Sequence, residues 1–269
     1  MADTTTPRQK RINDDSSVHQ ASPEEMSIQK HYLLLAYSTY CSSVILDGDL
    51  TSCPICDVFD GITLIKTFKS SFYDTNAMVI RDDKRKEVVA VFQGTFTLRG
   101  WIADLGALQI PYPAMKGAQV HKGFYENYME VANDLTAVVL DQAEKYPDYT
   151  IATTGNRHSL GGASSMFCAM DLFQRGVPAE KLRLYTQGGP RIGNKAFAEY
   201  VLSTKVPVTR LINKLDGGPH ISSPDFVHPG QEYWIQSDSF TRVCANGLES
   251  EKCSDSMEPL ALSAYDHIR

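Results

Sequence analysis

The sequence predicts an α/β protein with a central, mostly parallel (mixed) sheet flanked by helices. From Tyr149 to Asn213, β-rich runs alternate with helical runs, and this alternation is typical of strand–helix–strand units whose strands pair in parallel. Between Ile62 and Phe92, three β-rich runs are separated only by polar turns, which indicates antiparallel strands at one edge of the sheet. A chain of 269 residues, 42% of them hydrophobic, is long enough to bury one substantial core.

The first elements are a polar segment, a capped helix and three strands. Residues 1–21 are polar and lack the apolar stretch of a secretory signal peptide, so we expect a disordered segment before one domain over residues 22–269. Ser22-Pro-Glu-Glu25 has the form of a capping box with proline in the first turn, which predicts a helix from residue 23 to about residue 40. The three strands are expected at 62–68, 77–80 and 87–92.

The second half contains the longest helix that the pattern predicts. Apolar residues recur at steps of three and four from Phe124 to Val138, so we expect a helix over residues 122–145. The elements expected after it are a strand beginning near Tyr149, a helix over 160–174, a strand over 182–186, a helix over 194–203 and a strand over 208–213.

Charge and hydropathy exclude two classes of function. The formal net charge is -6, and lysine and arginine do not cluster, which argues against a nucleic-acid partner. No apolar run approaches the roughly 18 residues of a membrane span. The chain therefore reads as a globular protein without a transmembrane segment.

The order of elements around Ser159 is that of a nucleophile elbow. A β-branched run is followed by a glycine-containing turn and then by a helix-forming segment. In an elbow the strand ends, the chain turns sharply, and the serine hydroxyl is exposed at the top of the sheet. The following helix directs its terminal N–H groups at the site, which favours a developing oxyanion. Ser159 is the candidate nucleophile, and an ordinary Gly/Ser-rich turn is the alternative.

The spacing within this turn departs from the motif G-x-S-x-G. Arg157 stands two residues before the serine, where a small residue would let strand and helix approach, and Gly155 stands four residues before it. Without Asn156 and Arg157 the stretch would read Thr-Thr-Gly-His-Ser-Leu-Gly-Gly-Ala, which contains the intact motif. We interpret the pair as a two-residue insertion into an elbow.

The base is expected among the histidines that follow the serine, since the usual chain order is serine, acid, histidine. These histidines are His220, His228 and His267. His220 is four residues from Asp216, so a single loop would have to supply both base and acid. His267 is therefore the preferred base, although a histidine near a chain end is also typical of a solvated side chain.

The acid is expected at the carboxyl end of a strand, where open α/β sheets place their functional loops. Asp216 follows the strand predicted over residues 208–213 and is the first choice, with Asp225 in reserve. An aspartate before two glycines is also typical of a simple turn.

An oxyanion hole needs two donors, one from the residue after the nucleophile and one from the loop after an earlier strand. Leu160 supplies the first through its backbone N–H. Thr95 follows the strand end Val91-Phe-Gln-Gly94 and supplies the second, unless it is only a turn residue at the strand end.

A short lid helix is expected after this loop. Leu98, Trp101, Ile102 and Leu105 would share one face of a helix, on a segment bounded by glycine and proline. Such a segment suits a movable lid that covers an apolar cleft and opens at a lipid surface. The alternative is an ordinary surface helix packed on the core.

The cysteines indicate short disulfides. Cys53-Pro-Ile-Cys56 is compatible with a redox pair, half a zinc site or a short disulfide, but a zinc site needs a second pair at similar spacing. Cys244 and Cys253 are too far apart in the sequence to supply that pair. We expect two disulfides, Cys53 with Cys56 and Cys244 with Cys253.

Two cysteines remain outside these pairs. Cys168 falls within the apolar pattern of the helix after Ser159, which favours an inert core thiol. Cys41 is left without an assigned partner.

Several motifs together identify a family. The chain resembles the filamentous-fungal class 3 triacylglycerol lipases, the group of the Rhizomucor and Rhizopus enzymes, from about Glu25 to its last residue. The matching stretches are Tyr73-Asp-Thr-Asn-Ala-Met78, Trp101-Ile-Ala-Asp-Leu105, Val120-His-Lys-Gly-Phe124, His158-Ser-Leu-Gly-Gly-Ala163, Leu184-Tyr-Thr-Gln-Gly188 with Pro190-Arg191, and Glu232-Tyr-Trp234.

The resemblance implies an α/β-hydrolase fold and hydrolysis of long-chain glyceride esters at an oil–water interface by a monomer. Carried over by position, it implies Ser159 as nucleophile, Asp216 as acid and His267 as base, with Thr95 and Leu160 as oxyanion donors. The lid would lie at about residues 97–108. No metal or organic cofactor is implied.

The resemblance also bears on the cysteines and on localisation. Family members continue to a cysteine that pairs with the equivalent of Cys41, so we expect a domain truncated at its C-terminus. Family and cysteine pattern point to secretion, whereas the amino terminus lacks an export signal, which leaves an intracellular location open.

Departures from the family pattern leave two other functions open. The Asn156-Arg157 insertion, Gln93 in place of arginine, Gly217-Gly218 after the acid, and the early chain end all bear on how firmly the site is held. One alternative is therefore an impaired homologue that binds lipid without turnover. The other is a lidless carboxylesterase of feruloyl or acetyl type, which the apolar Trp101 segment disfavours.

Overall fold

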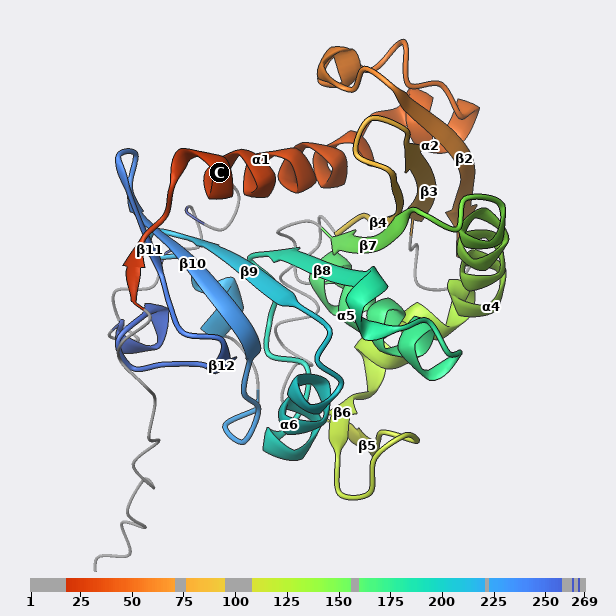
Figure 1. Ribbon diagram of the computed structural model, residues 1–269. Helices are drawn as coiled ribbons and strands as arrows, with labels where there is room; N and C mark the ends of the chain where they lie inside the picture. The colour runs from red at the N-terminus through yellow and green to blue at the C-terminus, as the bar shows by residue number, and fades with distance from the viewer. Residues whose placement is uncertain are drawn as a thin grey trace, which may run out of the picture.

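The computed structural model describes residues 18–70, 76–94, 108–155, 160–220 and 223–257, together with residues 263 and 266. These residues form one large mixed sheet with helices on both faces (Figure 1). A separate two-stranded ribbon, β5 and β6, lies beside α6 in the same view.

The large sheet has ten strands in the order β1-β11-β10-β9-β8-β7-β4-β3-β2, with β12 paired to β10. Its central pairs, from β4 through β7, β8 and β9 to β10, are parallel. The strands are β1 (His19–Gln20), β2 (Ile62–Lys69), β3 (Asn76–Asp82), β4 (Glu87–Phe92), β7 (Thr150–Gly155), β8 (Leu182–Gln187), β9 (Val208–Asn213), β10 (Pro229–Ser237), β11 (Phe240–Val243) and β12 (Gly247–Leu248), and the ribbon is β5 (Gln109–Pro111) with β6 (Gln119–His121).

Antiparallel strands are found at both edges of this sheet, not at one edge alone. The predicted edge is present, because β2 pairs antiparallel with β3 and β3 with β4. At the opposite edge β11 pairs antiparallel with β10 and with β1. The sequence analysis placed no strand after Asn213, so this second edge was missed.

The helices begin where side chains accept their free N–H groups. Ser22 caps α1 through a capping box, in which its hydroxyl accepts from the Glu25 N–H and the Glu25 carboxylate accepts from the Ser22 N–H. Nδ1 of His121 accepts from the Phe124 N–H at the start of α4. The helices are α1 (Pro23–Ser38), α2 (Ser42–Asp47), α4 (Lys122–Lys145), α5 (Leu160–Gln174) and α6 (Lys195–Ser203), with 3-10 turns at η2 (Cys56–Val58), η3 (Ala179–Lys181), η4 (Gly218–His220) and η5 (Ser254–Ser256).

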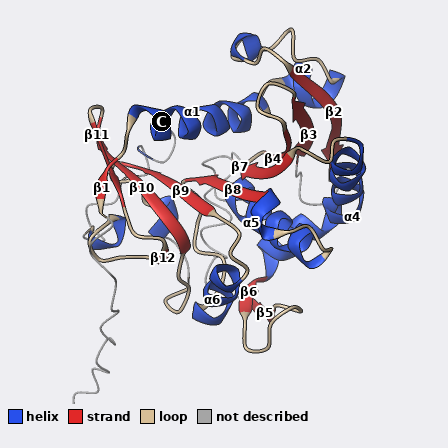
Figure 2. Cartoon of the chain, in the orientation of Figure 1, coloured by secondary structure: helices blue, strands red, loops and turns tan. Residues whose placement is uncertain are grey.

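Both faces of the sheet are buried. Alternate residues of one strand belong to two different apolar clusters: in β4, Val88 and Ala90 face the cluster of α4, α5 and α6, whereas Val89 and Val91 face that of α1 and α2. This is the period of two expected when side chains alternate between the faces of a strand. Figure 2 shows the helices on the two sides of the strands.

None of the helices in the described part of the chain is long and apolar enough to cross a membrane.

Candidate active site

The strand and the helix of the predicted elbow are both present. β7 ends at Gly155 and α5 begins at Leu160. Residues 156–159, which include Ser159 and the Asn156-Arg157 pair interpreted above as an insertion, lie outside the described residues. The described flanks, a strand followed after four residues by a helix, have the order that a nucleophile elbow requires.

Gly155 allows the end of β7 to touch the first turn of α5. A Cβ at this position would lie 1.8 Å from the backbone oxygen of Gly161 and 2.9 Å from the Gly162 nitrogen. Neither backbone atom can move without displacing the helix. Gly155 therefore allows the close approach of strand and helix that the sequence analysis expects from the glycine of an elbow, despite its displaced spacing.

A second glycine contact fixes the other side of the same helix turn. A Cβ on Gly162 would lie 2.9 Å from Cα of Gly189, which follows β8. Leu160, the first residue of α5, is buried. The amino end of α5 is thus held between two strand ends by contacts that only glycine permits, with its terminal N–H groups at the carboxyl edge of the sheet.

The strand that leads to the candidate oxyanion loop is anchored to α1. Nε2 of Gln93 donates to the Thr39 carbonyl and its Oε1 accepts from the Asn76 amide, both at 2.6 Å. The Tyr40 hydroxyl donates to the Gly94 carbonyl at 3.1 Å. Gln93, which replaces the family's arginine, therefore still ties this strand end to its neighbours.

Several predicted site residues lie outside the described residues. They are Thr95 of the oxyanion hole, the lid residues Leu98, Trp101, Ile102 and Leu105, the nucleophile Ser159 and the base His267. Leu160 and Asp216 are described, and their surroundings define the two sides of the candidate site.

Asp216 lies just beyond the carboxyl end of β9 and is fully buried. Its Oδ1 accepts from the Gly218 N–H at 2.8 Å, and its own N–H donates to the Asn213 carbonyl at 2.8 Å. The loop that follows, residues 214–220, is called the acid loop below. A carboxylate held in this way is restricted in rotation and shielded from water, as an orienting group for an imidazole must be.

The C-terminal segment lies beside the acid loop. Ser263 forms a bridge with Asp216, its N–H donating to the Leu215 carbonyl at 2.6 Å. The Asp266 carbonyl accepts from the Asn213 side chain at 3.0 Å. The chain immediately before His267 is thus bound to the strand end and loop that carry Asp216.

Of the two histidines passed over as bases, His220 is the last residue of the acid loop, and His228 binds that loop. Nε2 of His228 lies 2.9 Å from the Pro219 carbonyl, and its ring is buried. Burial, followed by the nearby Arg210 and Arg191 charges, holds the pKa of His228 well below 6.5. A neutral ring whose Nε2 donates to the Pro219 carbonyl stabilises the acid loop, and this nitrogen is not free to accept a proton as a general base.

The reserve acid Asp225 lies apart from these groups. Its carboxylate accepts from the side chain of Gln109 at 3.1 Å, on the separate ribbon formed by β5 and β6. This contact joins two surface segments, and Asp216 is the candidate acid that follows the carboxyl end of β9.

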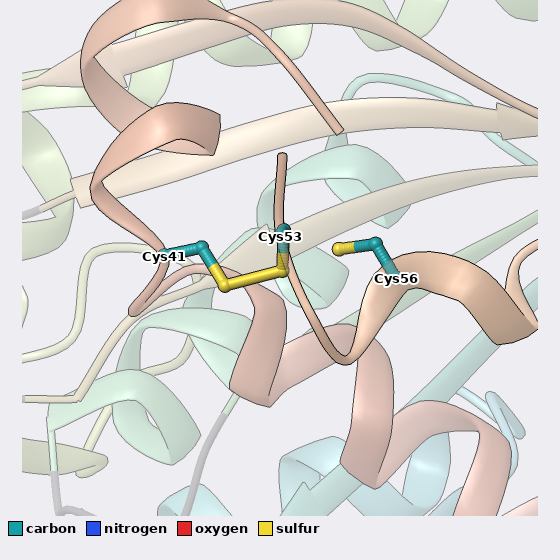
Figure 3. Close-up of side chains that lie close together, drawn as sticks. All are labelled: Cys41, Cys53 and Cys56. Atoms are coloured by element: carbon teal, nitrogen blue, oxygen red, sulfur yellow. A yellow bond between two sulfur atoms is a disulfide. The ribbon is translucent and has the colours of Figure 1, made fainter. Parts of the chain in front are cut away.

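The cysteines require one correction. The structure joins Cys53 to Cys41, with Cα atoms 5.7 Å apart, and leaves Cys56 as a buried thiol (Figure 3). Cys41 precedes α2 and faces the loop that carries Cys53, a proximity that sequence spacing cannot indicate. The expected pairing of Cys53 with Cys56 is therefore wrong in this structure, and Cys41 is not left over.

The other cysteines follow the sequence analysis. Cys244 and Cys253 form a disulfide with Cα atoms 6.5 Å apart. Cys168 is a fully buried thiol in α5, and burial raises its pKa. Burial and the nearby Asp57 raise the pKa of the Cys56 thiol to about 11. Both free thiols of the described residues are thus protonated near neutral pH and chemically quiet.

Within the described residues, two groups bring metal-ligating atoms together. One is Cys41, Cys53 and Cys56, and the other is Glu232, Cys244 and Cys253. In each group two of the three members are joined in a disulfide. Because metals bind the thiolate and not the disulfide, neither group offers more than one free ligand in this state.

Comparisons with known proteins agree with this geometry. The family model for lipase (class 3) matches residues 89–226. The lipase of Rhizomucor miehei is 44% identical over 260 residues, covering 94% of this chain and 70% of the relative. A secreted mono- and diacylglycerol lipase of Fusarium solani is 30% identical over 257 residues, covering 90% of this chain and 75% of the relative.

A solved structure gives the same result for the fold. A triacylglycerol lipase whose catalytic centre is a serine protease triad superposes with a TM-score of 0.88 at 44% identity, covering 93% of this chain and 95% of that chain. The mixed sheet with helices on both faces is accordingly the α/β-hydrolase fold. By sequence and by structure, this chain belongs to the class 3 lipase family.

Proposed function

We propose that this protein hydrolyses the carboxylic esters of glycerides through an acyl-enzyme, with Ser159 as nucleophile, His267 as base and Asp216 as acid. The observation that carries the proposal is the bridge between Ser263 and Asp216 of the acid loop, together with the binding of Asp266 to Asn213 at the end of β9 and to the Leu215 N–H of the loop. It ties the chain next to His267 to the loop that holds a buried carboxylate.

The mechanism follows from the roles of these groups. His267 accepts the Ser159 proton as the hydroxyl attacks the ester carbonyl, and it then protonates the departing alcohol. Asp216 orients the imidazole and stabilises its charged form. Water then cleaves the acyl-enzyme with the same base.

The oxyanion of each tetrahedral intermediate is bound by backbone donors. The first is the N–H of Leu160, at the amino end of α5, and the second is Thr95. Loss of one such donor typically lowers turnover by about 100- to 1000-fold. The glycine contacts of Gly155 and Gly162 support this role, because they fix the helix end relative to the sheet.

The proposal also includes a lid, the oligomeric state and the location of the protein. Leu98, Trp101, Ile102 and Leu105 form the apolar face of a lid that opens at an oil–water interface. The protein acts as a secreted monomer. Its two disulfides are typical of oxidising compartments, and they agree with the secreted relative.

A second candidate function is lipid binding without turnover. It is favoured by the four residues between Gly155 and Leu160, two of which, Asn156 and Arg157, lengthen the turn that carries the nucleophile. Since about 1 Å of misplacement can lower a rate about 100-fold, such a turn weakens catalysis while the fold is kept.

The experiment compares the unaltered chain, a variant lacking residues 156 and 157, and Ser159→Ala in each background. We expect slow hydrolysis of p-nitrophenyl butyrate and palmitate by the unaltered chain, faster hydrolysis after the deletion, and none with Ser159→Ala. A p-nitrophenyl phosphonate should label Ser159, as located by peptide mass spectrometry.

Two results would contradict the proposal. Labelling at another serine would remove Ser159 as nucleophile. Absence of both labelling and turnover in the deletion variant, with binding to triglyceride emulsions retained, would favour lipid binding instead.

A further inference from the structure

Charged side chains that are buried or partly buried lie next to the acid loop, and the proposed mechanism uses none of them. Arg210 of β9 and Glu232 of β10 form an ion pair at 3.0 Å with both side chains 3% exposed. The Glu232 carboxylate also accepts from the Ser254 N–H at 2.8 Å. Arg191, which follows β8, forms ion pairs with Glu249 and Asp255 at 2.9 and 2.7 Å.

Arg191 joins three separate segments through one guanidinium group. Its Nε donates to Glu249 and its Nη2 to Asp255, which lie on either side of Cys253 in the disulfide to Cys244. Its Nη1 donates to the carbonyl of His220, the last residue of the acid loop, at 3.4 Å. A planar guanidinium presents these donors in a fixed fork, so the three segments are held in one relative arrangement.

The acid loop needs such an attachment because of its own sequence. Gly217 and Gly218 follow Asp216 directly, and glycine leaves the backbone more freedom than any other residue. The Gly218 N–H is nevertheless the donor that holds Oδ1 of Asp216. The position of Asp216 therefore depends on what holds the chain just after the glycines.

Two side chains bind the residues of the acid loop that follow the glycines. His228 binds the Pro219 carbonyl at 2.9 Å, and Arg191 binds the next carbonyl, that of His220. His228 is 4% exposed, so its bond is shielded from water. The carbonyl of Pro219 is thereby bound by the residue just before β10, and the carbonyl of His220 is linked through Arg191 to Glu249 of the disulfide-closed loop.

We propose that Arg191 is a positioning residue for catalysis, which links the disulfide-closed loop Cys244–Cys253 to the acid loop and so holds the Asp216 carboxylate in place for the base. This inference rests on the proposed function of Asp216 as the acid of the triad. Arg191 itself contacts neither substrate nor reacting atoms.

The electrostatics of the cluster provide an independent readout. Burial, and then the charge of Arg191, lowers the pKa of His220, whereas Glu232 and Asp255 raise it and Arg210 lowers it. Replacing Arg191 by a neutral residue should therefore raise the pKa of His220, measured by the chemical shifts of its ring protons.

The test uses Arg191→Met and Arg191→Lys, with Arg175→Met as the matched control. Arg175 also binds a carboxylate and a neighbouring helix, through Asp171 and Asn133, but it follows the C-terminal end of α5, opposite the end that lies at the candidate site. We expect kcat for p-nitrophenyl butyrate to fall about 10- to 100-fold in Arg191→Met with KM nearly unchanged. In Arg191→Lys kcat should fall less, and in Arg175→Met it should stay unchanged.

A structural readout separates this inference from the proposed function. Hydrogen exchange of the Gly218 amide, measured by NMR, should become faster in Arg191→Met and Arg191→Lys but not in Arg175→Met. Asp255→Asn, which keeps an acceptor oxygen, should give an intermediate rate. These measurements require no turnover.

The outcomes are distinguishable. If Asp216→Asn retains activity, the proposed triad is wrong, and faster Gly218 exchange would still show that Arg191 holds the loop. If Asp216→Asn is inactive while Arg191→Met keeps wild-type kcat and Gly218 exchange, the positioning role is wrong. The positioning role would also be wrong if Arg191→Met only lowered the melting temperature, while kcat and Gly218 exchange, measured well below that temperature, stayed unchanged.

Discussion

On the nucleophile side of the candidate site, β7 and α5 meet through glycine backbones, whereas on the acid side the loop after β9 is held by charged side chains and a disulfide. Gly155 and Gly162 allow contacts in which no side chain intervenes. Arg210 and Glu232 form a buried ion pair, and Arg191 forms partly buried ion pairs with Glu249 and Asp255. The glycine contacts depend on close backbone packing, and the acid loop depends on pairs of opposite charges.

This difference determines which substitutions destabilise the glycine contacts and which destabilise the ion-paired loop. Backbone contacts cannot be relieved by rotating a side chain, so one added methyl group displaces a whole helix. Ion pairs tolerate changes of shape but not the loss of one partner, because the remaining charge stays buried. The pairing side should therefore respond to redox state and pH, and the glycine side should not.

The largest effect is expected for Gly155→Ala. Its Cβ would lie 1.8 Å from the Gly161 oxygen, and we expect a loss of about 4 kcal/mol or more in the free energy of unfolding. Urea unfolding followed by circular dichroism measures it. Gly247→Ala is the matched control, since nothing lies within 4 Å of the added atom, and it should change stability by less than about 1 kcal/mol.

Arg210→Met should have the next largest effect, about 3–5 kcal/mol, because it leaves the Glu232 carboxylate buried without its partner. Arg210→Met combined with Glu232→Gln should recover much of this loss, since glutamine is neutral and keeps an oxygen for the Ser254 N–H. A double-mutant cycle by urea unfolding gives the coupling. Equal losses in the single and double variants would contradict the role of pairing.

Removing the Cys244–Cys253 disulfide by alanine replacement should cost about 2–3 kcal/mol, as expected for a loop with a sequence separation of 9. It should also lower kcat, because Glu249 lies within this closed loop, Asp255 lies two residues after it, and both bind Arg191. Removing the Cys41–Cys53 disulfide, with a separation of 12, should cost similar stability without the loss of kcat. Thermal melting and ester hydrolysis of both variants measure this contrast.

The smallest effect concerns pH. The pKa of His228 is lowered by burial in the folded state, so below about pH 6.5 the unfolded state binds more protons and the folded state loses stability as pH falls. Between pH 7.5 and 5.5 we expect about 1 kcal/mol less loss in His228→Gln than in the unaltered chain. Urea unfolding at both pH values measures it.

A glycine-side variant provides the control for this pH effect. Gly189→Ala introduces no titratable group, so its change in stability should be the same at pH 7.5 and 5.5. Glu249 contributes with the opposite sign, since burial raises its pKa above 4.5 and the folded state then binds the additional proton as pH falls. If His228→Gln retained the full pH dependence, His228 would not be its source.

Local sequence signals located several elements well. The three- and four-residue periodicity gave α4 as Lys122–Lys145, and the segment after Ser159 gave α5 as Leu160–Gln174, as observed. The capping box at Ser22 marked the start of α1. These signals succeed because they depend on residues within one or two turns of each other.

Other features were not predicted from the sequence, because they depend on residues that are far apart in the chain. The strands β10 and β11 carry polar residues whose partners, such as Arg210 and Glu25, lie far away in the sequence. Cys53 pairs with Cys41 because α2 turns back toward the loop of Cys53. The support of Asp216 by Arg191 and His228 likewise has no local signal.

By itself the sequence determined the α/β class, the strand–turn–helix order around position 159 and the placement of Asp216 after a strand, because periodicity, capping and strand ends are written in neighbouring residues. Only the tertiary structure decided that Gly155 packs on the backbone of α5, that Cys41 binds Cys53, and that Arg191 joins the acid loop to a disulfide-closed loop. Such contacts arise when segments far apart in the chain are brought within a few ångströms, and no local pattern records that approach.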